Sequence, residues 1–195
     1  MSRLLRYITH PQVLIDPLIP VPEWCLSDQG RERAAQFGKL PSLQSVDKIV
    51  SSGEKKAIET ATIISAVIGI PIEVCEKTHE NDRSATGFLK PTEFENVADA
   101  FFGSPKKSIR GWETAVHAQS RIVAETIKVL DEESQGDILM VGHGAVGTLL
   151  YCYLANLGID RSYDQPPGGG HMFTYNIENK TIVHAWKSVE SLLQT

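Results

Sequence analysis

Two apolar runs in this sequence each end on a histidine. One covers residues 4–8 and precedes His10, and the other covers residues 137–141 and precedes His143. Short apolar runs of this kind are typical of buried strands in a parallel sheet. Because open α/β sheets bind their ligands outside the carboxyl ends of the strands, the pattern predicts that both histidines converge on one ligand.

The remaining hydrophobic positions follow strand or helix periods between clear breakers. Further strands are predicted at residues 46–51, 71–75, 171–177 and 181–186, the last two forming a hairpin. Helices are predicted from Ser27 to Gly38, between Gly53 and Gly69, from Pro91 to Phe102, from Trp112 to Asp131 and from Ala145 to Leu157. The helical spacing puts Ala57, Ala61, Ile64 and Val67, and later Ile122, Val123, Ile127 and Leu130, on faces that meet the core.

Strands that alternate with helices predict an α/β fold of three layers, α/β/α, with a mostly parallel sheet and helices on both faces. The 195 residues, of which 42% are hydrophobic, suit a single domain over residues 1–195. Two segments interrupt the alternation. Residues 12–22 are rich in proline and are expected to cross the ligand crevice as an extended loop. Residues 77–110 are expected to insert as a lid, with an ordinary surface excursion as the alternative.

Charge and cysteine content narrow the possible partners and location. A net charge of −5 argues against nucleic acid or an anionic membrane as the main partner. No apolar run reaches the roughly 18 residues that a membrane span needs. The three cysteines, Cys25, Cys75 and Cys152, match no metal or redox motif and suit a reducing compartment. Since the chain also enters its first strand without a signal peptide, a cytoplasmic protein is expected.

The segments around the histidines resemble the histidine phosphatase superfamily, whose fold is phosphoglycerate mutase-like, over nearly the full length of the chain. Thr9-His10-Pro11 stands where the family has Arg-His-Gly, and Gly142-His143-Gly144 matches the second catalytic histidine. Residues 26–34 resemble the family's Leu-Thr-x-x-Gly-x-x-Gln-Ala stretch, and residues 51–61 are similar to Ser-x-x-x-Arg-Ala-x-Gln-Thr-Ala. The resemblance implies that His10 is phosphorylated, that Glu80 is the general acid and base, and that His143 is catalytic and binds phosphate.

The chain departs from the family pattern where phosphate would be held. Thr9 and Lys56 replace the two family arginines, and Pro11 replaces the glycine. A guanidinium binds phosphate through two parallel hydrogen bonds, whereas lysine acts as a point charge and threonine brings no charge. The phosphate pocket is therefore expected to be short of cations. Lys56 as a solvated helix residue and Glu80 in a solvated turn remain the alternatives at those positions.

Other groups could compensate for the missing arginines. Arg83, close to Glu80 on the expected lid, is the candidate for restoring a cation. A protonated His143 and the helix start at Ser52 could donate to the phosphate, although Ser52 suits an N-cap equally well. Thr9 could contribute its hydroxyl. His171 begins a strand and either approaches this site from the far edge or lies at the surface.

The residue types support phosphoryl transfer without a metal or another cofactor. An imidazole with a pKa of about 6.5 is a nucleophile at neutral pH, so His10 can accept the phosphoryl group and split hydrolysis into two steps. Glu80 would protonate the leaving alkoxide and then take a proton from water. A metal site formed by His10, Glu80 and His143 is disfavoured because none of them has local ligand spacing.

The expected function is therefore a metal-independent phosphatase that acts on a small phosphorylated substrate. The alternative is a protein that binds inorganic phosphate or a phospho-ligand with little turnover, which the loss of both arginines favours. A phosphomutase is less expected, because a pocket short of cations suits a bisphosphorylated intermediate poorly. The retained acid and histidines favour the hydrolase, since a binding protein has no chemical need for them.

Overall fold

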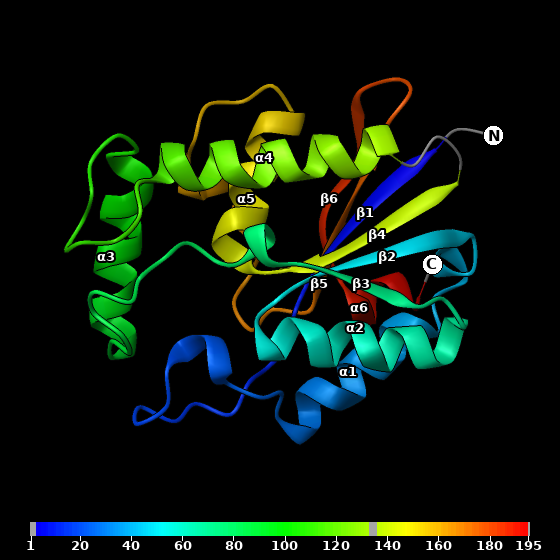
Figure 1. Ribbon diagram of the computed structural model, residues 1–195, viewed down its shortest axis with the longest axis horizontal. Helices are drawn as coiled ribbons and strands as arrows, with labels where there is room; N and C mark the ends of the chain where they lie inside the picture. The colour runs from blue at the N-terminus through cyan, green and yellow to red at the C-terminus, as the bar shows by residue number, and fades with distance from the viewer. Residues whose placement is uncertain (1–2, 133–135, 195) are drawn as a thin grey trace.

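The computed structural model describes residues 3–132 and 136–194, which form a six-stranded sheet with helices on both faces (Figure 1). The strands lie in the order β3-β2-β4-β1-β5-β6. They are β1 (Leu4–Thr9), β2 (Val46–Ser52), β3 (Ile72–Cys75), β4 (Asp137–Gly142), β5 (His171–Asn176) and β6 (Thr181–Ser188). β3, β2, β4 and β1 run parallel, whereas β5 pairs antiparallel with both β1 and β6. The predicted α/β fold with a mostly parallel sheet is confirmed.

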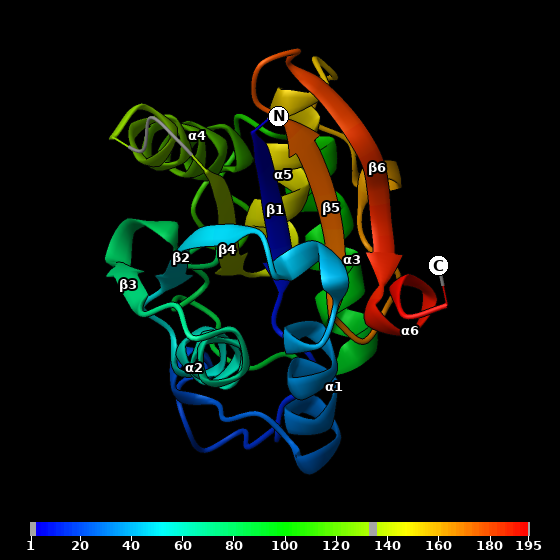
Figure 2. The same ribbon diagram turned by 90° about the vertical axis from the view of Figure 1, so that its right-hand side faces the viewer.

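The helices form the two outer layers (Figure 2). α1 (Asp28–Gly38), α2 (Lys55–Ile68) and α6 (Val189–Leu192) cover one face, and α4 (Ala115–Glu132) and α5 (Gly144–Leu154) cover the other. α3 (Pro91–Gly103) lies on the side toward which the carboxyl ends of β1 and β4 point (Figure 1). Short 3₁₀ turns at Val21–Glu23, Pro41–Leu43, Glu76–Thr78 and Arg161–Tyr163 complete the described structure. None of its helices combines the length and apolar content needed to cross a membrane.

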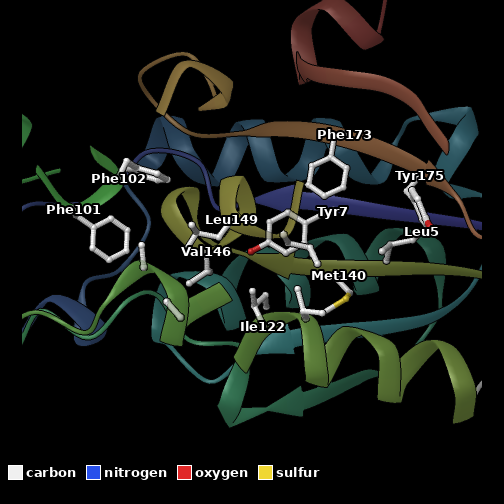
Figure 3. Close-up of a cluster of buried hydrophobic side chains, with 14 of the residues drawn as sticks. Leu5, Tyr7, Phe101, Phe102, Ile122, Met140, Val146, Leu149, Phe173 and Tyr175 are labelled. Atoms are coloured by element: carbon white, nitrogen blue, oxygen red, sulfur yellow. The ribbon is translucent and has the colours of Figure 1, made fainter. Parts of the chain in front are cut away.

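Alternation along the central strands explains why both faces carry a core. Leu5 and Tyr7 of β1 point to the α4–α5 side, whereas Ile8 points to the α1–α2 side. In the same way, Met140 and Leu139 of β4 belong to opposite cores. Figure 3 shows the first of these cores, in which sheet residues pack against α4 and α5. Continuous apolar runs are thus what a strand covered on both faces requires.

Two residues that helical spacing predicted for the core are exposed. Val67 is 46% exposed, and Ile127 is 40% exposed. Val67 lies in the last turn of α2, where it packs beside Gly38 of α1 rather than on the sheet. In α4 the buried face includes the small residues Ala118 and Thr126. Ile127 follows Thr126 in the sequence and lies beside this buried face rather than on it.

Two helix boundaries also differ from the predicted ones. α4 begins at Ala115 rather than Trp112, because Thr114 caps its start: the Thr114 hydroxyl accepts from the His117 backbone N–H at 3.2 Å. α5 ends at Leu154 rather than Leu157, and Asn156, with φ of 56°, turns the chain out of the helix. Left-handed backbone conformations cannot continue a right-handed helix.

Tyr7 joins the first strand to the start of α5. Its hydroxyl accepts a hydrogen bond from the His143 backbone N–H at 3.0 Å and donates to the His143 carbonyl at 3.2 Å. Its ring fills space that only glycine leaves open, because a Cβ on Gly147 would lie 2.5 Å from Tyr7 Cε1. A Cβ on Gly142 would lie 2.2 Å from the Tyr7 hydroxyl. The close approach of α5 to β1 therefore depends on these two glycines.

We expect Gly147→Ala to lower the free energy of unfolding by roughly 1–3 kcal/mol, the usual cost of overpacking a core. This clash should outweigh the roughly 1 kcal/mol that alanine gains in a helix. Urea denaturation measures the difference. Gly103→Ala is the matched control, because it also lies in a helix and its Cβ would meet no atom within 4 Å. Equal or greater stability of Gly147→Ala would contradict the steric role of Tyr7.

Candidate active site

The two histidines meet at the carboxyl edge of the sheet because their strands pair directly. In the parallel register of β1 and β4, Thr9 lies opposite Gly142. The next residues are His10 and His143, and the His10 backbone N–H donates to the Gly142 carbonyl at 2.9 Å. The centroids of the two imidazole rings are 5.3 Å apart. The two imidazoles therefore lie side by side at this edge of the sheet, as the sequence predicted.

The environment of His10 leaves one ring nitrogen available. Its Nδ1 lies 2.8 Å from the Pro11 carbonyl, which can only accept, so Nδ1 carries the proton and Nε2 carries the lone pair. Burial, together with the nearby His143 and Lys56, lowers the pKa of His10 to about 3. At neutral pH His10 is thus a neutral imidazole. It lines a cavity of about 470 Å³.

His143 is completely buried and is not among the residues that line this cavity. Its Nε2 lies 2.8 Å from the Ser52 hydroxyl and 3.7 Å from the Glu54 carboxylate. Burial lowers the pKa of His143 to about 3, outweighing the opposing effect of Glu54. Burial thus favours the neutral imidazole, and a protonated His143 that donates to bound phosphate stays a prediction.

Lys56 is buried and forms an ion pair with Glu54, a residue that the sequence analysis did not single out. Lys56 also donates to the Val21 carbonyl at 3.0 Å. Burial would raise the pKa of Glu54, but His143 and Lys56 outweigh it and lower the pKa to about 2. In the sequence, the Glu54–Lys56 ion pair is indicated only by the position of the two residues, which lie two apart at the start of a predicted helix. The cation expected for phosphate already has a carboxylate partner.

Glu80 lies at the start of α5, next to His143. Its carboxylate accepts from the backbone N–H groups of Val146 at 3.0 Å and Ala145 at 3.1 Å. Helix N-termini stabilise negative charge in this way. The Glu80 backbone N–H donates to Glu54 at 2.9 Å, which ties the segment to α2. Glu80 lines the same cavity as His10, so the expected acid and nucleophile share one space.

Arg83 reaches this cavity from the segment before α3. Its guanidinium carbon lies 4.9 Å from the centroid of the Phe94 ring, a cation–π contact. Burial lowers the pKa of Arg83, while Glu80 and Glu54 oppose that shift. Within residues 3–132 and 136–194, no carboxylate lies within 4.0 Å of its guanidinium. Arg83 is therefore a cation at the cavity that is not already paired.

Thr9 and Ser52 use their hydroxyls on protein partners. The fully buried Thr9 hydroxyl donates to Gln165 at 2.6 Å and accepts from the His171 backbone N–H at 3.1 Å. Ser52 contacts His143 and accepts from the Glu54 backbone N–H at 3.3 Å. His171 itself is buried, not at the surface. Phosphate contacts by Thr9 and Ser52 stay predictions, and each would compete with these hydrogen bonds.

Arg33 organises the glycine loop that closes one side of the cavity, a role that sequence patterns did not reveal. Its buried guanidinium donates to the carbonyls of Gly169 at 2.9 Å and Gly170 at 3.2 Å. It also pairs with Glu190 at 2.6 Å. The Gly170 backbone N–H in turn donates to the His10 carbonyl at 3.2 Å. The loop thereby holds the backbone of the candidate nucleophile.

Among the residues that the structure describes, no three histidine, cysteine or acidic side chains are grouped so as to hold a metal ion.

A second cavity, of about 670 Å³, adjoins the first and shares Glu80, Asn81 and Arg83 with it. The described arrangement can thus offer a nucleophilic nitrogen, a carboxylate and a cation to one anionic ligand.

Buried neutral histidines make stability depend on pH. His143 binds no proton in the folded protein until the pH approaches about 3, whereas it protonates near 6.5 when unfolded. The unfolded state therefore binds the extra proton, and stability falls as the pH drops from 6.5 toward 3. We expect His143→Gln to reduce the slope of unfolding free energy against pH by about 1.4 kcal/mol per unit between pH 4 and 6. Denaturant titrations measure the slope, and an unchanged slope would contradict a neutral His143. Asn179→Gln, which changes no titratable group in the exposed turn between β5 and β6, is the control.

Comparison with solved structures agrees with the fold. The chain resembles a mycobacterial glucosyl-3-phosphoglycerate phosphatase solved with inorganic phosphate, with 20% identity, a TM-score of 0.74, and 97% of this chain and 99% of that chain covered. It also resembles Bacillus stearothermophilus YhfR, with 20% identity, a TM-score of 0.77, and 94% and 95% covered. A third similar structure is the alpha-ribazole phosphatase from Shigella flexneri, with 19% identity, a TM-score of 0.70, and 95% and 96% covered. These identities show a shared fold.

No curated protein matches the sequence. A family model does match it, over residues 21–185, which include Lys56, Glu80 and His143, while His10 precedes the matched range. The match covers most of the chain. The chain therefore belongs to the histidine phosphatase superfamily (branch 1) and, with it, to the class of phosphoric monoester hydrolases.

Proposed function

We propose that this protein is a metal-independent phosphatase that transfers the phosphoryl group of a small phosphomonoester to His10 and then to water. The observation that carries the proposal is the orientation of His10. The Pro11 carbonyl holds the proton on Nδ1, so the Nε2 lone pair is free in the cavity that Glu80 also lines. A neutral imidazole in this tautomer is ready to attack phosphorus without a base to activate it.

The first step forms a bond from His10 Nε2 to phosphorus and breaks the bond from phosphorus to the ester oxygen. The electron pair of the broken bond goes to the leaving oxygen, to which Glu80 gives a proton. The new phosphoimidazole carries a positive charge, which the Pro11 carbonyl stabilises through Nδ1–H. In-line transfer of this kind depends mainly on positioning and on donors to the phosphoryl oxygens.

The second step returns His10 to its starting state. Glu80 takes a proton from water, whose oxygen attacks phosphorus on the side opposite Nε2. The bond from phosphorus to nitrogen breaks, its electron pair returns to the imidazole, and inorganic phosphate leaves. The backbone donors that hold Glu80 at the start of α5 keep its carboxylate beside the reacting group in both steps.

The similar structures support a phosphomonoester as substrate. Two of them are named as phosphatases, of glucosyl-3-phosphoglycerate and of alpha-ribazole phosphate, and one of these was solved with inorganic phosphate. The leaving group would enter the 470 Å³ cavity, which Phe94 and Trp112 line beside Arg83. Residues 77–110, which include α3, then act as the expected lid over the leaving group.

A phospho-ligand-binding protein with little turnover is the second candidate. The pairing of Lys56 with Glu54 favours it, because the pair leaves little net positive charge for a phosphate dianion. A phosphomutase is disfavoured for the same reason, since a bisphosphorylated intermediate needs more cationic donors than this cavity offers.

Turnover distinguishes the first candidate from the second. We expect the wild-type protein, without added metal, to release phosphate from a generic aryl phosphate or from members of a panel of small phosphomonoesters. We expect His10→Ala to lower kcat by at least about a thousandfold, because the covalent route is lost. Phosphohistidine hydrolyses in acid. The reaction is therefore stopped by rapid denaturation at alkaline pH, and the mass of the protein shows whether it carries a phosphoryl group. His184→Ala, on β6 where His184 contacts Thr174 and lines neither cavity, should retain full activity. Phosphate binding without turnover or a phosphoenzyme would favour the binding protein.

Removing the carboxylate of Glu54 tests whether it limits phosphate binding. In Glu54→Gln, Lys56 loses its partner and a negative charge leaves the site, so we expect the affinity for inorganic phosphate to rise about tenfold. The free energy of unfolding should fall by about 3 kcal/mol, because a buried lysine is left unpaired. Calorimetric titration and urea denaturation measure the two effects. Glu23→Gln, on an exposed side chain, should change neither, and weaker phosphate binding by Glu54→Gln would contradict this account.

A further inference from the structure

Asn81 is a buried polar residue whose side-chain amide is unused. The residue is 5% exposed, and its Nδ2 has no hydrogen-bond partner among the described residues. It lines both the cavity of His10 and the adjoining cavity. Buried amide groups are nearly always hydrogen-bonded, because an unpaired donor keeps the full cost of leaving water. Nδ2 itself is covered by protein atoms, so a rotation of the Asn81 side chain is needed to bring this unpaired donor to a ligand in the cavity that accepts a hydrogen bond.

The backbone around Asn81 is held in place, so only its side chain has to move to reach a ligand. The Asn81 backbone N–H donates to the Glu80 carboxylate at 3.1 Å. The guanidinium of Arg121 donates to the His79 carbonyl at 3.0 Å and to the Lys77 carbonyl at 2.7 Å, and it pairs with Glu113 at 2.8 Å. These contacts come from α4, which forms part of the core. The segment therefore presents Asn81 from a fixed position.

Three of the other donors expected for phosphate are already engaged, and Arg83 remains as the unpaired cation. Lys56 pairs with Glu54, the Thr9 hydroxyl donates to Gln165, and Ser52 contacts His143. A phosphoryl group has several acceptor oxygens, and its transfer depends on donors that are in place before the reaction. Asn81 lines the cavity that His10, Glu80 and Arg83 also line, so its amide can add a neutral donor to the cation of Arg83.

We infer that Asn81 is a substrate-binding residue whose Nδ2–H group donates to an oxygen of the bound phosphoryl group. The inference rests on the proposed function, since it adds a neutral donor to the same site. Asn81 and Arg83 hold the phosphoryl group from the segment before α3, and His10 attacks it from the end of β1. A neutral donor binds the anion without a second buried charge, which fits a site whose lysine is already paired.

Asn81→Leu tests the inference, because leucine has a similar size and no donor. We expect the affinity for inorganic phosphate, measured by calorimetric titration, to fall about tenfold, and kcat/KM on an aryl phosphate to fall by a similar factor. The melting temperature without phosphate should stay the same or rise, because an unpaired buried amide is replaced by an apolar group. Asn96→Leu, on the exposed face of α3, is the matched control and should leave phosphate affinity unchanged.

Asn81→Asp provides a second variant that keeps the shape of the side chain. It replaces the donor by a carboxylate, so phosphate binding should be weaker than in Asn81→Leu. If Asn81→Leu lowers the melting temperature and both variants bind phosphate as the wild type does, Asn81 has a structural role and the inference is overturned. It is also overturned if the wild type does not bind phosphate.

The inference and the proposed function can fail separately. If the wild type binds phosphate without turnover and both Asn81 variants lose that binding, the inference stands and the phosphatase fails. If the wild type hydrolyses phosphomonoesters and Asn81→Leu keeps its kcat/KM and phosphate affinity, the phosphatase stands and the inference fails.

Discussion

The hydrogen bonds of the Tyr7 hydroxyl to the backbone of His143 are the constraint on which the site depends. Tyr7 belongs to β1 and lies three residues before His10, so one strand carries both the candidate nucleophile and the anchor of the second histidine. The Tyr7 ring stacks on Phe173 with centroids 5.4 Å apart, which fixes it within the core. Since α5 starts at this point, the same contact sets the backbone donors that receive Glu80.

The charges at the site nearly cancel in the unliganded protein. His10 and His143 are neutral at physiological pH, Glu54 and Lys56 form a pair, and Arg83 opposes Glu80. Buried charges need partners, because moving an unpaired ion out of water costs several kcal/mol. A site with more unpaired cations would bind phosphate more strongly but would be less stable without it. The Glu54–Lys56 pair is one way for a fold with a buried lysine to remain stable when the ligand is absent.

Local pattern was enough to predict the sheet, the main helices and the two strand-end histidines. Strands covered on both faces need apolar residues at every position, which makes them readable without any contact information. Burial of individual helix residues was less predictable, and Val67 and Ile127 show that an apolar side chain at helical spacing can still lie outside the packed stripe. There the neighbouring elements decide which residues are covered.

The partners within the site could not be predicted, because they come from distant parts of the chain. Thr9 contacts Gln165, 156 residues later, and Glu54 accepts from the Glu80 backbone, 26 residues later. Neither contact leaves a periodic signal in the sequence. The proximity of His10, His143 and Glu80 is now observed, while their catalytic roles stay predictions.

The shortage of cations weighs less against hydrolysis than against tight binding. A charge that contacts phosphate equally in substrate, transition state and product contributes uniform binding, which lowers KM without raising kcat. Losing such a charge weakens binding of the substrate and of the phosphate product alike, and so favours product release. The parts that act on the reacting bond are the ones this site keeps, namely the Nε2 lone pair of His10 and the carboxylate of Glu80. A protein that only binds phosphate would be expected to keep the opposite set, with strong cations and no oriented nucleophile.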